Sequence, residues 1–101
     1  MLTLTIRKKW FDMMVSGVKV EEYREIKPYY TSRFKEYINK RGYVKFRNGY
    51  DKSSPFFICW VHYGIGTGKP EWGAEKNRVY YVLSIESLQY NNVYMTHRPR
   101  C

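Results

Sequence analysis

The chain has 101 residues and a mass of 12.3 kDa, a length that suits one domain. Hydrophobic residues make up 44% of it, with 7 Gly and 4 Pro, which excludes a mainly disordered or collagen-like chain. The longest apolar run, residues 56–61, is far shorter than the about 20 residues of a membrane span. The N-terminal charges follow a very short apolar segment, the reverse of a secretory signal. We therefore expect one soluble, cytoplasmic domain over residues 1–101.

The chain is strongly basic, and its charge is unevenly distributed. Eighteen Lys and Arg residues against 9 Asp and Glu residues give a net charge of +9. Residues 1–50 carry 12 basic and 5 acidic side chains, whereas residues 51–101 carry 6 and 4. This balance favours RNA or a nucleotide as partner, because binding to phosphates releases condensed counterions. The 11 tyrosines suit unpaired bases better than a duplex, although many of them are also typical of half-buried strand positions.

The first half of the chain alternates strand and helix patterns. Residues 2–6 alternate apolar and polar side chains, which predicts a strand, and residues 7–16 then follow a helical period that Gly17 ends. Residues 20–25 return to the period of a strand. A second helix is predicted to begin at Pro28 and to end before Gly42, on the spacing of Tyr30, Phe34, Tyr37 and Ile38.

The second half predicts strands only. Its segments are a strand at residues 43–47, a turn at Asn48-Gly49, a long central strand at 56–63, a glycine-rich loop at 64–70, a strand at 79–88, and an aperiodic, partly mobile tail at 91–101. The resulting order, β-α-β-α-β-β-β, does not keep the alternation that a doubly wound parallel sheet needs. We expect the α+β class, as a small, partly open mixed β-barrel with two short helices.

Several familiar catalytic and cofactor motifs fail on inspection. The run Gly64 to Lys69 lacks the first Gly and the final Ser or Thr of a phosphate-binding loop, and Lys69 stands where a dinucleotide fingerprint needs Gly. Cys59 and His62 are three apart on a strand, so their side chains point to opposite faces and do not share a metal. His97 lies in the aperiodic tail, without a nucleophile motif elsewhere. We expect no metal, no cofactor, and two free thiols, at Cys59 and Cys101.

The segment that carries chemistry is the turn from the first helix into the second strand, residues 17–25. Lys19 follows the turn, and Glu22 and Arg24, two apart on the strand, share a face. Glu22 can orient Arg24 by a charge-assisted hydrogen bond, which leaves guanidinium donors for a phosphate or a base edge. The alternative is a strand edge decorated with solvated charges.

This segment, Gly17-x-Lys19-x-x-Glu22-x-Arg24, resembles the G-x-K-x-x-E-x-R signature of the ASCH domain family, in the PUA-like superfamily. Similar stretches occur in the same order at residues 2–6 with 9–11, 22–29, 47–50 and 70–74, so that the resemblance runs to about Leu88. It implies a small β-barrel with a cleft between the first helix and the barrel. Family members are regarded as RNA-binding modules, and some act on RNA or on modified nucleosides.

The resemblance implies an RNA-binding cleft. Two alternatives stay open: an enzyme on the same scaffold, and a protein-interaction module whose cleft takes a peptide or an acidic partner. That enzyme is a metal-independent ribonuclease or an N4-acylcytidine amidohydrolase, with Lys19 and Glu22 as catalytic candidates. The amidohydrolase branch carries Thr where this chain has Glu22, while Lys19 matches it. The expected RNA-binding residues, with Tyr30 near them, are Arg7, Lys8, Lys9, Lys19, Glu22, Tyr23, Arg24, Tyr29, Tyr50 and Trp72.

Overall fold

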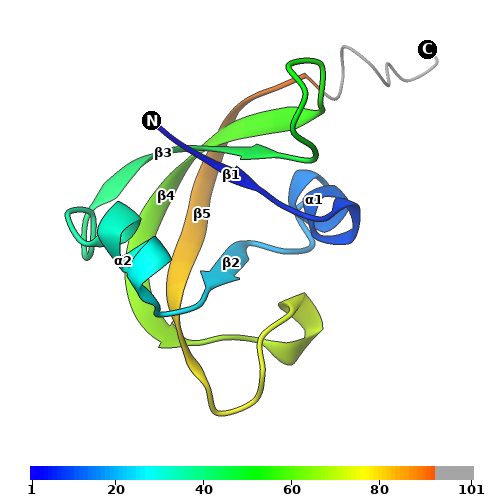
Figure 1. Cartoon of the computed structure of the whole chain (residues 1–101). Helices are drawn as coiled ribbons and strands as arrows, with labels where there is room; N and C mark the ends of the chain where they lie inside the picture. Colours follow the sequence, from blue (N-terminus) through cyan, green and yellow to red (C-terminus); the bar gives the residue numbers. More distant parts are fainter. Residues whose placement is uncertain (93–101) are drawn as a thin grey trace.

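Strands and helices follow one another in the order that the sequence predicts (Figure 1). The computed structural model describes residues 1–92, and the bounds below refer to that part of the chain. The elements are β1 (Leu2–Thr5), α1 (Lys8–Val15), β2 (Glu21–Arg24), α2 (Pro28–Phe34), β3 (Arg41–Arg47), β4 (Phe56–Thr67), the short 3-10 helix η1 (Pro70–Trp72) and β5 (Val79–Asn91). The α+β class is therefore confirmed.

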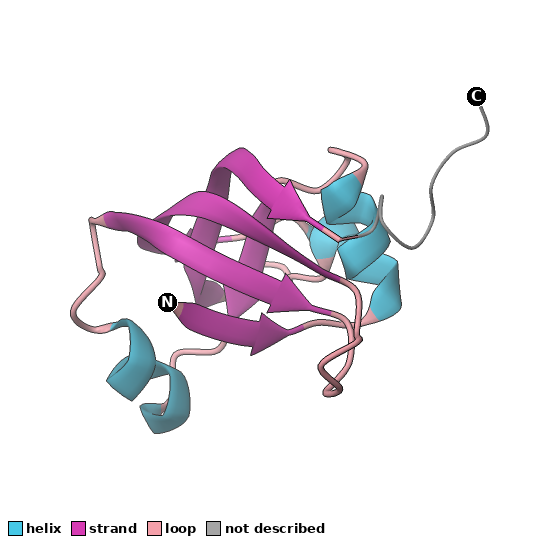
Figure 2. Cartoon of the chain, turned by 90° about the horizontal axis from the view of Figure 1, so that it is seen from above, coloured by secondary structure: helices cyan, strands magenta, loops and turns pink. Residues whose placement is uncertain are grey.

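The strands form one curled, mixed sheet in the order β1-β3-β4-β5-β2. β1 pairs with β3 in parallel, and the other pairings are antiparallel. β4 lies in the middle, as the apolar run at 56–63 predicts. The sheet curls into a half-barrel whose edge strands are β1 and β2, and the two α-helices lie at opposite ends of it (Figures 1 and 2).

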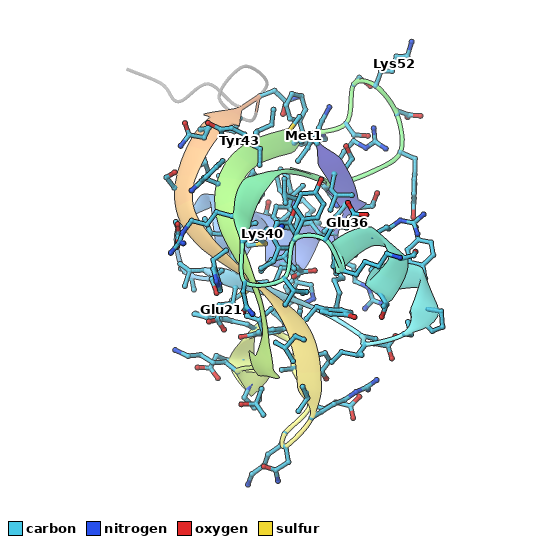
Figure 3. All side chains as sticks on the ribbon, turned by 90° about the vertical axis from the view of Figure 1, so that its left-hand side faces the viewer. Met1, Glu21, Glu36, Lys40, Tyr43 and Lys52 are labelled. Carbon is cyan, nitrogen blue, oxygen red and sulfur yellow. The ribbon has the colours of Figure 1, made fainter. Side chains whose placement is uncertain are left out.

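The core lies inside the curl, where side chains from the sheet and both helices meet (Figure 3). Burial alternates along β3 and along β4 up to Tyr63, so every second residue of these strands faces inward. α1 contributes Phe11 and Met14, and α2 contributes Phe34. Cys59 is among the buried residues and carries a free thiol, as predicted.

The second helix is shorter than its spacing predicts, because α2 ends at Phe34. Asn39 takes a left-handed φ of 63° and donates its N–H to the carbonyl of Tyr63 at 2.8 Å, which leads the chain into β3. The ring of Tyr37 stacks on Tyr63 with centroids 5.0 Å apart, and Ile38 packs against the core. Their apolar character therefore reflects packing in a turn rather than a continuing helix.

The glycine-rich run predicted as a loop is partly strand. Residues 64–67 extend β4 and pair with residues 79–82 of β5, because a partner strand satisfies their backbone groups whatever the side chains are. Gly68 follows, and a Cβ there would lie 2.6 Å from the ring of Tyr23, so the close approach requires glycine.

The last strand extends into the segment that the sequence predicts as a tail. β5 continues to Asn91, three residues beyond the predicted end at Leu88, and the N–H of Asn92 donates to the carbonyl of Phe56 at 3.1 Å. The rest of that tail, residues 93–101 with His97 and Cys101, lies outside the described residues.

The buried core predicts loss of stability in alkali. Burial raises the pKa of the Cys59 thiol from 9.0 to about 12, and it also raises the pKa of Tyr63 and Tyr23. Above pH 9 the unfolded chain gives up protons that the fold retains, so the free energy of unfolding should fall as pH rises from 9 towards 12. Lys19, whose pKa is lowered in the fold, opposes this fall but is one group against three. Urea titrations under reducing conditions at pH 8, 9.5 and 10.5 measure the effect.

The matched variant for this test is Cys59→Ala. It removes the thiol and should make the dependence of unfolding free energy on pH shallower above pH 9, whatever its stability at pH 8. An unchanged slope in this variant would contradict a role for the buried thiol.

Candidate functional site

The turn after α1 places Lys19 in the interior. Gly17 has a left-handed φ of 85°, and the N–H of Lys19 donates to the carbonyl of Met13 at 2.9 Å, so the chain folds back over the helix end. The two neighbouring valines are then turned outward: Val18 is 59% exposed and Val20 42%, whereas Lys19 is 1% exposed. Hydrophobicity alone would favour the opposite arrangement, with the two valines buried and the lysine exposed.

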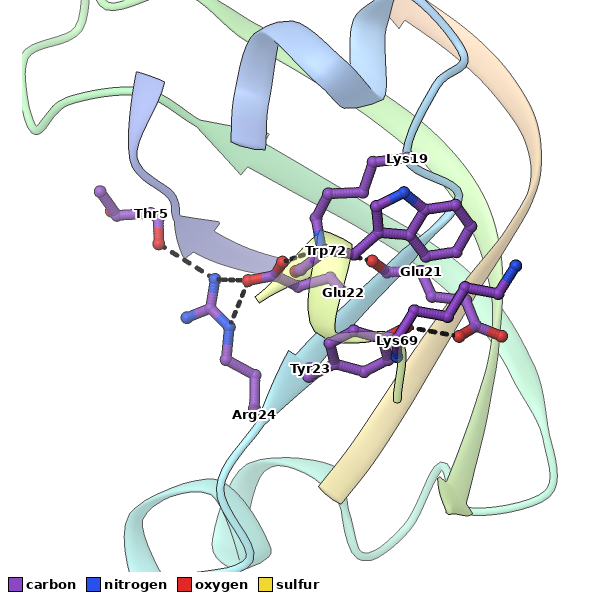
Figure 4. A network of polar contacts seen from close by, with 8 residues as sticks. All are labelled: Thr5, Lys19, Glu21, Glu22, Tyr23, Arg24, Lys69 and Trp72. Atoms are coloured by element: carbon purple, nitrogen blue, oxygen red, sulfur yellow. Dashed lines mark hydrogen bonds and ion pairs between the residues drawn. The ribbon is translucent and has the colours of Figure 1, made fainter. Parts of the chain in front are cut away.

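The Lys19 ammonium is held by three acceptors. It donates to the carbonyl of Glu21 at 2.6 Å and to that of Trp72 at 2.9 Å, and it lies 3.2 Å from Oε1 of Glu22 (Figure 4). It also lies over the rings of Trp10 and Tyr23, at 5.2 and 4.9 Å from their centroids. Burial lowers the pKa of Lys19, and the Glu22 carboxylate opposes that shift. Because all three of its hydrogens have acceptors, the ammonium has none left for a ligand, and its role is to hold Glu22 in place.

Glu22 and Arg24 share a face of β2, which confirms the prediction from their spacing. Oε2 of Glu22 accepts from Nε of Arg24 at 2.9 Å and lies 2.7 Å from Nη2. Glu22 is buried, and its carboxylate thus lies between two cations, the ammonium at one oxygen and the guanidinium at the other. The pairing fixes the plane of the guanidinium.

Arg24 also joins the two edges of the half-barrel. Its Nη2 donates to the carbonyl of Thr5 in β1 at 3.1 Å (Figure 4), and its Nη1 donates to the hydroxyl of Tyr30 at 3.2 Å. A guanidinium has five N–H donors, so one Nη1 hydrogen is left without a partner among residues 1–92. Arg24 is therefore both anchored and able to donate to a ligand.

A cavity of about 260 Å³ opens beside this pair. β1 with the start of α1 forms one wall, and β2 with Tyr30 forms the other. Its lining residues are Thr5, Ile6, Arg7, Trp10, Glu22, Tyr23, Arg24, Glu25 and Tyr30. The volume lies just below the roughly 300–1,000 Å³ of drug-sized ligand sites, which suits one small ring system with its polar substituents.

The predicted site residues on α1 and β2 are distributed unevenly around the cavity. Arg7 and Tyr23 line it, and the Tyr23 hydroxyl donates to Glu21 while accepting from the N–H of Lys69 (Figure 4). Lys8 does not line it and pairs with Asp12 at 2.6 Å. Lys9 is exposed, with its ammonium 4.6 Å from the centroid of the Trp10 ring.

The predicted aromatic residues lie in two places. Tyr29 and Tyr50 line a second cavity next to the first, together with Tyr30. Trp72 lines neither cavity: its carbonyl accepts from Lys19, and the Lys69 ammonium lies over its ring at 4.6 Å. The loop carrying Trp72 therefore covers Lys19 and forms no part of the cavity wall.

Sequence reasoning did not assign Trp10, Thr5 or Glu25 to the site. Trp10 has the spacing of an ordinary core position on α1, yet it lines the cavity and lies beneath Lys19. Thr5 contributes a backbone carbonyl, and no sequence pattern predicts which carbonyl an arginine will meet. Glu25 also lines the cavity. Its place directly after the last signature residue, Arg24, is the one feature of the sequence that could have predicted this.

Residues 1–92 contain no group of three or more His, Cys, Asp or Glu side chains able to hold a metal ion. In the same part of the chain no helix has the length and apolarity needed to cross a membrane. No protein-family model matches the chain, and neither does any curated protein or solved structure. The geometry of the cavity and the signature residues are therefore the features of this chain that indicate a function.

Proposed function

We propose that this chain is a cytoplasmic, ASCH-type, PUA-like module that binds single-stranded RNA in the cavity beside Arg24. The observation that carries the proposal is the unpartnered Nη1 hydrogen of Arg24, on a guanidinium that Glu22, Thr5 and Tyr30 hold in place at the cavity wall. A pre-oriented guanidinium recognises phosphate oxygens and base edges with little loss of side-chain entropy on binding.

The surroundings of the cavity support an anionic, aromatic ligand. Arg7 adds a second cation to the lining, and Lys8 and Lys9 follow it on the exposed start of α1. Trp10, Tyr23 and Tyr30 supply rings to the same cavity. A base has a ring face to stack and edges to hydrogen-bond, and its phosphate meets the cations, so a nucleotide uses all three kinds of lining group.

The test is titration of the protein with fluorescent single-stranded RNA at several salt concentrations. We expect Arg24→Met to weaken binding by about 1–3 kcal/mol. The matched control is Arg41→Met: Arg41 also pairs with a glutamate, Glu86, at 2.8 Å, but on the sheet away from the cavity, and its loss should leave affinity unchanged. Equal affinity of the Arg24 variant and the wild type would refute the proposed site.

Arg7→Met provides a second measurement that does not disturb the buried network. Arg7 is exposed and lines the cavity. Its loss should reduce the slope of log K against log salt by about 1 while circular dichroism and melting stay as in the wild type. Binding to duplex as tight as binding to a single strand would count against the single-stranded preference.

A second candidate function is metal-independent hydrolysis in the same cavity. The observation that favours it is Glu22, a buried carboxylate in the lining of the cavity. From this position the carboxylate could act as a general base on a water molecule in the cavity. Incubation with RNA and with N4-acetylcytidine, in the presence of a chelator, tests it. Turnover that disappears in folded Glu22→Gln protein would establish the hydrolase, and absence of turnover would leave binding as the function.

A further inference from the structure

A second cavity, of about 190 Å³, adjoins the first across Arg24. The two share Thr5, Arg24 and Tyr30 in their linings, so these three residues form a common wall. The other lining residues of the second cavity are Thr3, Leu4, Tyr29 and Tyr50. Its lining has no carboxylate, whereas the first cavity has Glu22 and Glu25. The second cavity is thus an aromatic site whose only lining charge is positive.

Tyr50 presents its ring to solvent at the edge of this cavity. It is 83% exposed, and within residues 1–92 its ring contacts no other ring and its hydroxyl makes no hydrogen bond. The loop that carries it is nevertheless anchored: Arg47 donates to the carbonyl of Gly49 at 2.9 Å, and Asn48 donates to that of Ile6 at 2.9 Å. Figure 3 shows the same loop projecting from the molecule as far as Lys52.

Tyr29 and Tyr30 supply two further rings to the cavity that Tyr50 lines. Their rings meet edge to face at 4.9 Å, and the Arg33 guanidinium lies over Tyr29 at 3.6 Å from its centroid. Tyr30 stacks on the buried ring of Phe34. Such rings, backed by cations and by the core, are suited to stacking with a flat base.

The common wall offers two hydrogen-bond donors. One is the remaining Nη1 hydrogen of Arg24. The other is the hydroxyl hydrogen of Tyr30, because its oxygen accepts from Arg24 and no acceptor for its own hydrogen occurs in the described part of the chain. Two donors on one wall, with an aromatic cavity on either side, match a phosphodiester between two bases.

We propose that the two cavities bind two consecutive nucleotides of one RNA strand. The linking phosphate lies at Arg24 and Tyr30, and one base stacks on the tyrosines of the second cavity. This inference rests on the proposed function and adds the ligand's minimum length: the preferred ligand is a dinucleotide or longer. Stacking on tyrosine tolerates any base, so the second cavity selects for chain length more than for sequence.

The test compares dinucleoside monophosphates, ApA and CpC, with AMP and CMP by NMR titration of the wild type and of single variants. We expect the dinucleotides to bind the wild type more tightly than the mononucleotides. Tyr50→Ala should weaken dinucleotide binding by about 5-fold to 150-fold, the effect of one lost base stack, and should weaken AMP binding less, since AMP can occupy the first cavity alone. Tyr43→Ala is the matched control, since Tyr43 is an exposed tyrosine on β3 that lines neither cavity.

The outcomes separate this inference from the function on which it rests. If none of the four compounds binds, the proposed function itself fails. If AMP and ApA bind equally, or if Tyr50→Ala leaves ApA binding unchanged, the first cavity binds a nucleotide and the second does not. A Tyr50→Ala variant that loses self-association while keeping ApA binding would assign the second cavity to a second copy of the chain and overturn the inference.

Discussion

Replacing Lys19 by methionine should lower the free energy of unfolding by about 3–5 kcal/mol, the usual effect of removing one partner from a buried ion pair. The side chain is fully buried, and its loss leaves the carbonyls of Glu21 and Trp72 without their donor. It also leaves the buried Glu22 carboxylate with Arg24 as its only cationic partner among the described residues. Urea-induced unfolding followed by tryptophan fluorescence measures the change.

Lys8→Met is the matched control for this substitution. Lys8 also pairs with a carboxylate, Asp12, at 2.6 Å, but both side chains are largely exposed. An exposed pair of this spacing contributes about 0.3–0.5 kcal/mol, and a cation at the start of a helix is disfavoured by the helix dipole, so the net change should be close to zero. Similar losses in the two variants would show that burial of Lys19 does not matter for stability.

Glu22→Gln should also destabilise the fold by about 3–5 kcal/mol, although it preserves the shape of the side chain. Among the described residues Glu22 is the one carboxylate that bridges Lys19 and Arg24, and the substitution leaves the buried ammonium and the partly buried guanidinium without their shared counter-charge. Denaturant unfolding again measures the effect, with Glu86→Gln as the matched control. Glu86 pairs with Arg41 at the surface, where water replaces the lost interaction.

The same variant should acquire a distinctive pH dependence. In the wild type Glu22 raises the pKa of Lys19, while burial and Arg24 lower it. Without the carboxylate, the pKa of Lys19 in the fold falls further below its ordinary value of 10.5. Between the folded-state pKa and 10.5, the unfolded chain therefore binds more protons than the folded chain. Relative to that of the wild type, the stability of the variant should therefore increase as pH rises towards 10.5. A flat profile would contradict this account of the network.

Much of the fold could be predicted from the sequence because strand and helix periods are local properties. The alternation in residues 2–6 and 43–47 predicted β1 and β3, and Gly17 marked the end of α1. The errors occur where tertiary contacts override local pattern. Tyr37 packs on Tyr63 in a turn, and residues 64–67 become strand because β5 supplies their hydrogen-bond partners.

The candidate site divides in the same way. Glu22 and Arg24 could be placed together from their spacing, since residues two apart on a strand share a face. The burial of Lys19 could not be predicted from the sequence, because one of the three acceptors of its ammonium is the carbonyl of Trp72, which is 53 residues away in the chain. The position of Trp10 beneath the ammonium depends on the same long-range packing.

By itself the sequence determined the order of strands and helices, the basic charge, and the shared face of the carboxylate and the guanidinium. These follow from residue types and from spacings of a few residues. Only the tertiary structure decided that the edge strands β1 and β2 approach each other, with Arg24 bound to the carbonyl of Thr5 between two cavities. The physical reason is that curling the sheet depends on the packing of the whole core, and that packing brings together groups that no local pattern relates.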